Sequence, residues 1–438
     1  MVERGWKMVL MAAGLLATTV PSAGAATKVE QVTSPGGIQA YLVSEPSIPF
    51  LSMSIHFKGG SALDPSGKDG LAYMVSGLLD EGAGALDSQA FRTELEDLAI
   101  QLSFDAQRDG FTGELKTLTE HRDRAFELLR LALSAPRFDA EPVERIRNQI
   151  AASLRRSSED PDYLASLTWF ETAFAGQPYG RPVRGTVESV AGLEVADLRG
   201  FVARRLAKDN LIIGVAGDVG AAELGVLLDR AFGDLPATSA PFELAAMTPQ
   251  GGRTIVEHRD VPQSQMIFGE AGLARDDPDY YAAYVVNHVL GGGGFTSLLT
   301  EEVREKRGLA YSVYSYLYPL DGAPIWLGGL GTANGSVDEA LRLVRQEIGR
   351  VAAGEIGQDQ LDDAKTYLTG SFPLRLTSND RIARTLVGMQ LDGLGIDYLE
   401  RRNTYIEAVT LEDARRVAAR LYHPDALLVV VVGGVGGA

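Results

Sequence analysis

An internal duplication constrains the fold of this chain more than any other feature of its sequence. Two continuous apolar runs, each closed by glycine, occupy residues 209–217 and 425–433, about 215 residues apart. Each run is typical of a buried strand. Two apolar stretches with helical spacing, at 70–79 and 281–290, repeat with a similar offset. The chain is therefore predicted to contain two copies of one structural unit.

The order of strand and helix patterns predicts the class of that unit. In the first copy, the runs 101–106 and 110–117 meet at Arg108-Asp109, which favours a tight hairpin. Three helical stretches follow at 121–134, 140–157 and 162–175, with Pro161 and Pro178 at their ends. Paired strands beside grouped helices indicate an α+β fold, with a mostly antiparallel sheet covered by helices.

Short upstream runs extend the duplication to the strands that precede each helical stretch. They occupy 38–43 and 50–57 in the first copy, and 253–257 and 265–269 in the second. Between the copies lies a segment rich in proline and glycine, which is typical of a linker. We expect an N-terminal domain at 26–236, a linker at 237–252 and a homologous C-terminal domain at 253–438.

The first 25 residues have the pattern of a secretory signal peptide. Arg4 and Lys7 precede an apolar run at 8–20, and small residues follow up to Ala25 and Ala26. The run is shorter than the roughly 20 apolar residues that span a bilayer. We therefore expect cleavage near Ala25 or Ala26, a periplasmic mature protein and no membrane span after cleavage.

Charge and cysteine content exclude several functions. The 438-residue chain has a formal net charge of -17, which would repel nucleic acid. It has no cysteine, so disulfides, thiolate catalysis and cysteine-based metal sites are excluded. The remaining candidates for chemistry are histidines, carboxylates, hydroxyls and arginines in specific motifs.

Two such motifs occur at corresponding places in the two copies. The first copy has a Gly59-Gly60-Ser61 turn, an Asp64-Pro65 step and Gly70-Leu71-Ala72 at the start of a helix. The second has a glycine run, made up of Gly291, Gly292, Gly293 and Gly294, followed by the sequence Val-Arg-Glu-Lys-Arg-Gly-Leu-Ala-Tyr-Ser-Val at 303–313. Because a helix precedes the glycine run, a phosphate cradle is disfavoured, and a turn or a substrate-contacting loop is favoured.

Together these motifs resemble the pitrilysin/insulinase-type zinc peptidases, and in particular the branch built from separate subunits, such as mitochondrial processing peptidase. The resemblance covers the whole mature chain. It implies that Arg304 and Tyr311 form a catalytic pair that reaches an active site. A phenol at such a site can donate a hydrogen bond to the oxyanion of a tetrahedral intermediate, and a guanidinium can orient the substrate.

The resemblance also implies a zinc motif that this chain lacks. The family's His-x-x-Glu-His pattern places two zinc ligands and a general base on one helical face. The three corresponding positions are Tyr73, Ser76 and Gly77. A third ligand would fall near residues 147–149, which hold no carboxylate, although Glu144 is close. The five histidines of the chain lack the ligand spacing of a helix, so we expect no metal here.

A retained Arg304/Tyr311 pair beside a lost zinc motif predicts a division of labour. We expect a protein that is inactive alone and serves as the non-zinc subunit of a periplasmic heterodimeric metallopeptidase. A zinc-bearing paralogous subunit would close a peptide chamber with it and receive Arg304 and Tyr311 in trans. The main alternative is a non-enzymatic peptide-binding or structural core-type subunit. An active homodimer with an unrecognised metal site is a third possibility.

Overall fold

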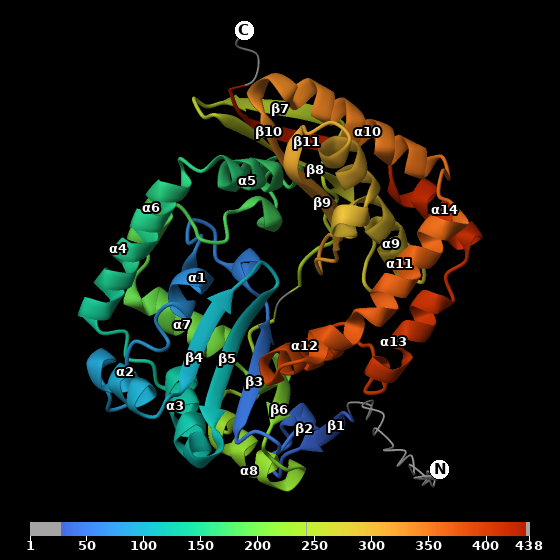
Figure 1. The fold of residues 1–438 in the computed structure, drawn as a ribbon. Helices are drawn as coiled ribbons and strands as arrows, with labels where there is room; N and C mark the ends of the chain where they lie inside the picture. Colours follow the sequence, from blue (N-terminus) through green and yellow to red (C-terminus); the bar gives the residue numbers. More distant parts are fainter. Residues whose placement is uncertain (1–27, 242, 435–438) are drawn as a thin grey trace, which may run out of the picture.

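Two mixed sheets form the framework of the molecule (Figure 1). The computed structural model describes residues 28–241 and 243–434, so the predicted signal peptide lies outside the described part. In the first sheet the strand order is β1-β2-β6-β3-β5-β4, and in the second it is β7-β11-β8-β10-β9. Among the described strands, β2 with β6 and β7 with β11 are parallel neighbours, and the other neighbours are antiparallel. The predicted fold class is confirmed.

The strands that were predicted lie close to their runs, because each of these runs alternates or is continuously apolar. In β5, for example, inward residues alternate with partly exposed ones. The strands of the first sheet are β1 (Glu30–Thr33), β2 (Gln39–Ser44), β3 (Phe50–Lys58), β4 (Gln101–Ala106), β5 (Gly110–Leu118) and β6 (Leu211–Gly217). Those of the second are β7 (Arg253–His258), β8 (Gln263–Ala271), β9 (Ala310–Tyr318), β10 (Ile325–Ala333) and β11 (Leu428–Gly433).

Helices of the same half enclose one large core against each sheet. In the first half they are α1 (Leu71–Ser76), α2 (Ser88–Asp97), α3 (Arg122–Ser134), α4 (Ala140–Ser157), α6 (Val187–Ala191), α7 (Val195–Arg205) and α8 (Ala221–Phe232). In the second half they are α9 (Tyr280–Asn287), α10 (Val337–Ala352), α11 (Gln358–Gly370), α13 (Tyr398–Glu407) and α14 (Leu411–Leu421). The helix expected at 70–79 is shorter than predicted, since Gly77 caps its C-terminus.

The two halves exchange a helix, which the sequence pattern did not predict. Helix α5 (Pro161–Ala173) belongs to the first half of the chain but packs on β11 and β8 of the second sheet. Helix α12 (Asn379–Leu391) belongs to the second half but packs on β6, β3 and β2 of the first sheet. Figure 1 shows α5 next to the second sheet in the upper part of the view and α12 next to the first sheet in the lower part. The predicted domain limits at 236 and 253 therefore separate the two sheets, but α5 and α12 each cover the sheet of the other half.

Glycines in the central strands allow this exchange. A Cβ atom on Gly214 of β6 would lie 2.2 Å from the carbonyl oxygen of Ala383 in α12. A Cβ atom on Gly269 of β8 would lie 3.0 Å from the ring of Trp169 in α5. A larger residue at Gly214 would push α12 away from the sheet, and one at Gly269 would crowd Trp169 of α5 as well as strand β10.

The β4–β5 hairpin adds a polar connection between the halves. Tyr179 donates from its hydroxyl to Asp109 Oδ1 at 2.5 Å and accepts from the backbone N–H of Gly322 at 2.7 Å. The N–H of Asp321 donates to Asp109 Oδ2 at 3.0 Å. The Arg108 guanidinium stacks 3.5 Å from the ring centroid of Phe170. The predicted hairpin tip thus forms part of the contact between the halves.

No helix in residues 28–241 and 243–434 combines the length and the apolar character needed to cross a bilayer.

Candidate functional site

The segment that leads into α1 is held by buried polar contacts. The Asp64 carboxyl accepts hydrogen bonds from the N–H groups of Gly70 at 3.0 Å and Ala72 at 3.1 Å, so it satisfies donors at the start of the helix. Gly70 has a φ of 88°, a conformation that glycine adopts without strain. Arg181 donates to the carbonyls of Asp64 and Ala62. These contacts fix the position of the first turn of α1, which carries Tyr73.

The three lost zinc-motif positions lie side by side. Tyr73, Ser76 and Gly77 line one hollow of about 480 Å³, together with Gln149 of α4. The Ser76 hydroxyl is buried and donates to the carbonyl of Tyr73 at 2.8 Å. The structure therefore brings together the residues that the motif aligned, but their side chains are a phenol, a hydroxyl used within its own helix, a hydrogen and an amide.

No carboxylate replaces the expected third ligand. The Glu144 side chain is 61% exposed and pairs with Arg147 at 3.2 Å, and Arg147 itself donates to the carbonyl of Val190. Asp105 of β4 also lines the hollow. One carboxylate does not make a zinc site, which needs three or four ligands. Nowhere in the described ranges do three or more histidine, aspartate or glutamate side chains form a group that could hold a metal ion.

Three of the five histidines are explained by their surroundings. His288 stacks on the ring of Tyr367 with centroids 5.0 Å apart. His423 Nδ1 lies 2.9 Å from Glu270 Oε2. The His56 ring lies against Gly110, where a Cβ atom would be 2.0 Å from the ring. These environments support the interpretation of these three histidines as structural residues.

His56 gives a testable pH dependence. Burial, with a contribution from Lys58, lowers the pKa of His56 to about 4, below its ordinary value of 6.5. Because the unfolded state then binds the proton more readily, His56 should destabilise the fold as pH falls from 6.5 toward 4, by roughly 2–3 kcal/mol. Burial raises the pKa of Asp64 to about 7, which has the opposite effect over much of this range.

The His56 contribution is therefore measured as a difference. Urea unfolding of the wild-type chain and of His56→Gln at several pH values gives the difference between their free energies of unfolding. As the pH falls, the wild type should lose stability relative to His56→Gln. A difference in the free energy of unfolding that does not change with pH would show that His56 has the same pKa in the folded and unfolded states.

Arg304 and Tyr311 lie together on the second half. The guanidinium carbon of Arg304 is 5.1 Å from the ring centroid of Tyr311 and 4.5 Å from that of Phe295. The Tyr311 side chain is 85% exposed and Phe295 is 68% exposed. Arg304 is thus held between two rings by cation–π contacts. Phe295, which follows the glycine run, had not been singled out from the sequence; its place beside that run was the only signal.

A salt-bridged turn places the pair. The carboxylate of Glu302 forms ion pairs with Lys306 and Arg307, each at 2.6 Å. These ion pairs stabilise the turn between Arg304 and Tyr311. The N–H of Gly308, whose φ is +63°, donates to the carbonyl of Arg304 at 2.7 Å. Arg304 lies in a π-helical turn, η7 (Thr300–Glu305). Tyr311 is the second residue of edge strand β9.

The glycine run has a packing role at its first residue. Gly291 is buried, and a Cβ atom there would lie 2.4 Å from the hydroxyl of Ser315 in β9. A Cβ on Gly293 would lie 2.7 Å from the carbonyl of His288. Gly292 and Gly294 are exposed, and Gly294 has a φ of +57°. The run therefore ends η5 (His288–Gly292) and forms a turn after it, and its contact with substrate stays a prediction.

A duplicated sheet-and-helix scaffold, with zinc-motif positions that lack ligands in one half, places the chain in a zinc-peptidase class. Comparisons with known proteins agree with this class. Residues 40–187 match the insulinase family, peptidase family M16, and residues 192–368 match the domain described as the peptidase M16 inactive domain. The chain belongs to peptidase family M16.

The similar proteins include both peptidases and a non-peptidase. The "non-peptidase homolog YmxG" of Helicobacter pylori is 29% identical over 84% of this chain and 85% of its own length. The probable mitochondrial-processing peptidase subunit beta of Schizosaccharomyces pombe is 24% identical over 94% of this chain and 92% of its own. A crystal structure described as a peptidase M16 inactive domain, from Pseudomonas fluorescens, superimposes with a TM-score of 0.88 at 27% identity, covering 94% and 98% of the two chains. The predicted family is confirmed.

Proposed function

We propose that this chain is the non-zinc subunit of a periplasmic two-chain zinc metallopeptidase, and that it presents Arg304 and Tyr311 to the zinc site of a partner subunit. The observation that carries the proposal is the exposure of this pair. A phenol that is 85% exposed has no hydrogen-bond partner within the described residues, although its neighbour Arg304 is ordered by two rings. A purely structural residue gains little from such a position.

The zinc-motif positions that lack ligands support the same division of labour between this chain and a partner. Tyr73, Ser76 and Gly77 cannot bind zinc or act as a general base, so zinc would come from a paralogue that carries the His-x-x-Glu-His motif. The partner would close a peptide chamber against this chain, which requires an extended interface. The periplasmic location rests on the N-terminal sequence pattern.

The test is to co-express the mature chain with a zinc-motif paralogue from the same genome. We expect the two chains to co-purify, to contain zinc attributable to the partner, and to cleave peptides only as a complex. Metal analysis of this chain alone should give no stoichiometric zinc. Stoichiometric zinc in the isolated chain would contradict the proposal and favour an active homodimer.

A structural or peptide-binding subunit is the second candidate, because one relative is named a non-peptidase homologue. A stable complex without peptide cleavage, or cleavage by the partner alone at the rate of the complex, would favour this candidate.

A further inference from the structure

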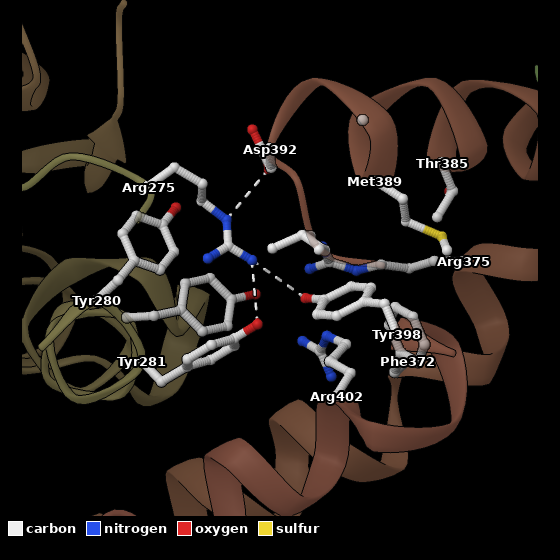
Figure 2. Close-up of a pocket in the computed structure, with 13 residues that line it drawn as sticks. Arg275, Tyr280, Tyr281, Phe372, Arg375, Thr385, Met389, Asp392, Tyr398 and Arg402 are labelled. Carbon is white, nitrogen blue, oxygen red and sulfur yellow. Dashed lines mark hydrogen bonds and ion pairs between the residues drawn. The ribbon is translucent and has the colours of Figure 1, made fainter. Parts of the chain in front are cut away.

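A second pocket lies in the C-terminal half, and neither Arg304 nor Tyr311 lines it. It has a volume of about 260 Å³. Its walls come from the segment before α9, from α9 and η9 (Phe372–Leu376), and from α12 and α13. Figure 2 shows the guanidinium groups of Arg275, Arg375 and Arg402 among aromatic rings in this space. Asp392 is the carboxylate that lines it.

Asp392 is already used by Arg275. Arg275 Nε lies 3.1 Å from Asp392 Oδ2, and its Nη2 donates to the hydroxyls of Tyr281 at 3.1 Å and Tyr398 at 3.4 Å (Figure 2). The guanidinium carbon of Arg275 also lies 4.3 Å from the ring centroid of Tyr280. One guanidinium of the pocket is thus neutralised and fixed.

Arg402 is buried, and the residues that the structure describes give it no counterion. It is only 5% exposed, and its Nη1 donates to the carbonyl of Leu368 and to Asn403 Oδ1, both at 3.1 Å. Its guanidinium carbon lies 4.1 Å from the ring centroid of Phe372. No carboxylate of residues 28–241 and 243–434 forms an ion pair with it. A buried charge without an opposite charge is costly unless a partner compensates it.

Arg375 adds a second guanidinium that the described part of the chain leaves without an ion pair or hydrogen bond. It lies on η9, and Figure 2 shows it reaching toward the rings of the pocket. The chain as a whole has a net charge of -17, so this local excess of positive charge runs against its composition. Two guanidiniums directed at one space form a site for an anion.

We propose that this pocket binds an organic carboxylate that carries an apolar, preferably aromatic, group. The carboxylate would pair with Arg375 and Arg402, since a guanidinium matches the two oxygens of a carboxylate. The apolar group would pack against Tyr284, Met389 and Leu394. A pocket of this size holds one residue or a small acid and not a long peptide. The C-terminus of a peptide and a free carboxylic acid share this chemistry.

The pocket also touches the connection between the halves. Met389 and Tyr398 belong to a small core that includes Val43 and Ala216 of the first sheet. A ligand held between α12 and α13 would therefore bind the folded, docked chain and stabilise it.

The experiment titrates the full mature chain with N-acetylphenylalanine and with its amide, by calorimetry and by thermal shift. The acid should bind and raise Tm, and the amide should bind at least about tenfold more weakly, because charge-assisted hydrogen bonds are lost. Arg375→Gln should weaken binding of the acid by about tenfold. Arg381→Gln, which removes an exposed arginine of α12 that does not line the pocket, should leave affinity unchanged.

Three results would overturn the proposal: equal binding of the amide, unchanged affinity of Arg375→Gln, or inorganic phosphate binding as tightly as the acid. Since Arg375 is exposed, its variant should fold even if Arg402→Met does not. Binding of a tripeptide that ends in phenylalanine with a free carboxylate distinguishes a peptide C-terminus from a free carboxylic acid as the ligand. Tighter binding than the single residue indicates a peptide C-terminus, and equal binding indicates a free acid; both support the carboxylate site.

Discussion

Replacing Tyr311 with phenylalanine is expected to lower the kcat of the complex with a zinc-bearing partner by about 10²-fold, the typical effect of losing one oxyanion donor. The substitution keeps the ring that contacts Arg304 and removes only the hydroxyl. Because Tyr311 is 85% exposed, this chain's own fold should not depend on that hydroxyl. The measurement is steady-state cleavage of a fluorogenic peptide by the purified complex.

Tyr316→Phe is the matched control. Tyr316 lies on the same strand, and its ring neighbours those of Tyr314 and Tyr318 with centroids 6.2 Å away in each case. Its variant should cleave at the wild-type rate. If Tyr311→Phe also retains kcat while the complex remains intact, the role in trans is wrong and the structural alternative gains support.

Replacing Trp169 with alanine is expected to destabilise the protein by about 3–5 kcal/mol, as for other buried large-to-small changes at aromatic positions. Trp169 is fully buried and donates from Nε1 to the carbonyl of Leu428 in β11 at 3.1 Å. Its ring also packs edge-on against Phe170, with centroids 5.2 Å apart. The substitution would open a cavity where α5 crosses onto the second sheet and would weaken the docking of the two halves.

Urea denaturation followed by circular dichroism measures this loss without relying on tryptophan fluorescence. Trp169→Phe keeps a ring in the same place and should lose less stability. Val226→Ala, at a side chain that is 55% exposed on α8, should change stability by no more than about 0.5 kcal/mol. A loss below about 1 kcal/mol for Trp169→Ala would show that the helix exchange contributes little to stability.

Local patterns explain why so much of the fold was predictable. The β4–β5 hairpin, the strand at β6 and the limits of α4 follow from periodicity, turn residues and prolines that act within a few residues of each other. The absence of the zinc motif was equally accessible, because a metal site requires specific side chains and their absence is visible in the sequence.

Other features depended on residues far apart in the chain. The turn that carries Arg304 is π-helical, and Phe295 joins the pair through packing that no spacing rule specifies. Arg402 lies in a helix whose sequence gives no sign of an unpaired buried charge, since its surroundings come from η9 and α9.

The sequence alone determined the duplicated α+β plan, the family resemblance and the loss of zinc ligands at Tyr73, Ser76 and Gly77, because each depends on residue identity and short-range periodicity. The tertiary structure decided that α5 and α12 change places between the halves, that Arg304 is held between Phe295 and Tyr311, and that Arg275, Arg375 and Arg402 share one pocket. The physical reason is that side-chain packing and charge pairing across long sequence separations depend on how the elements dock, and amphipathic patterns leave the choice of docking partner open.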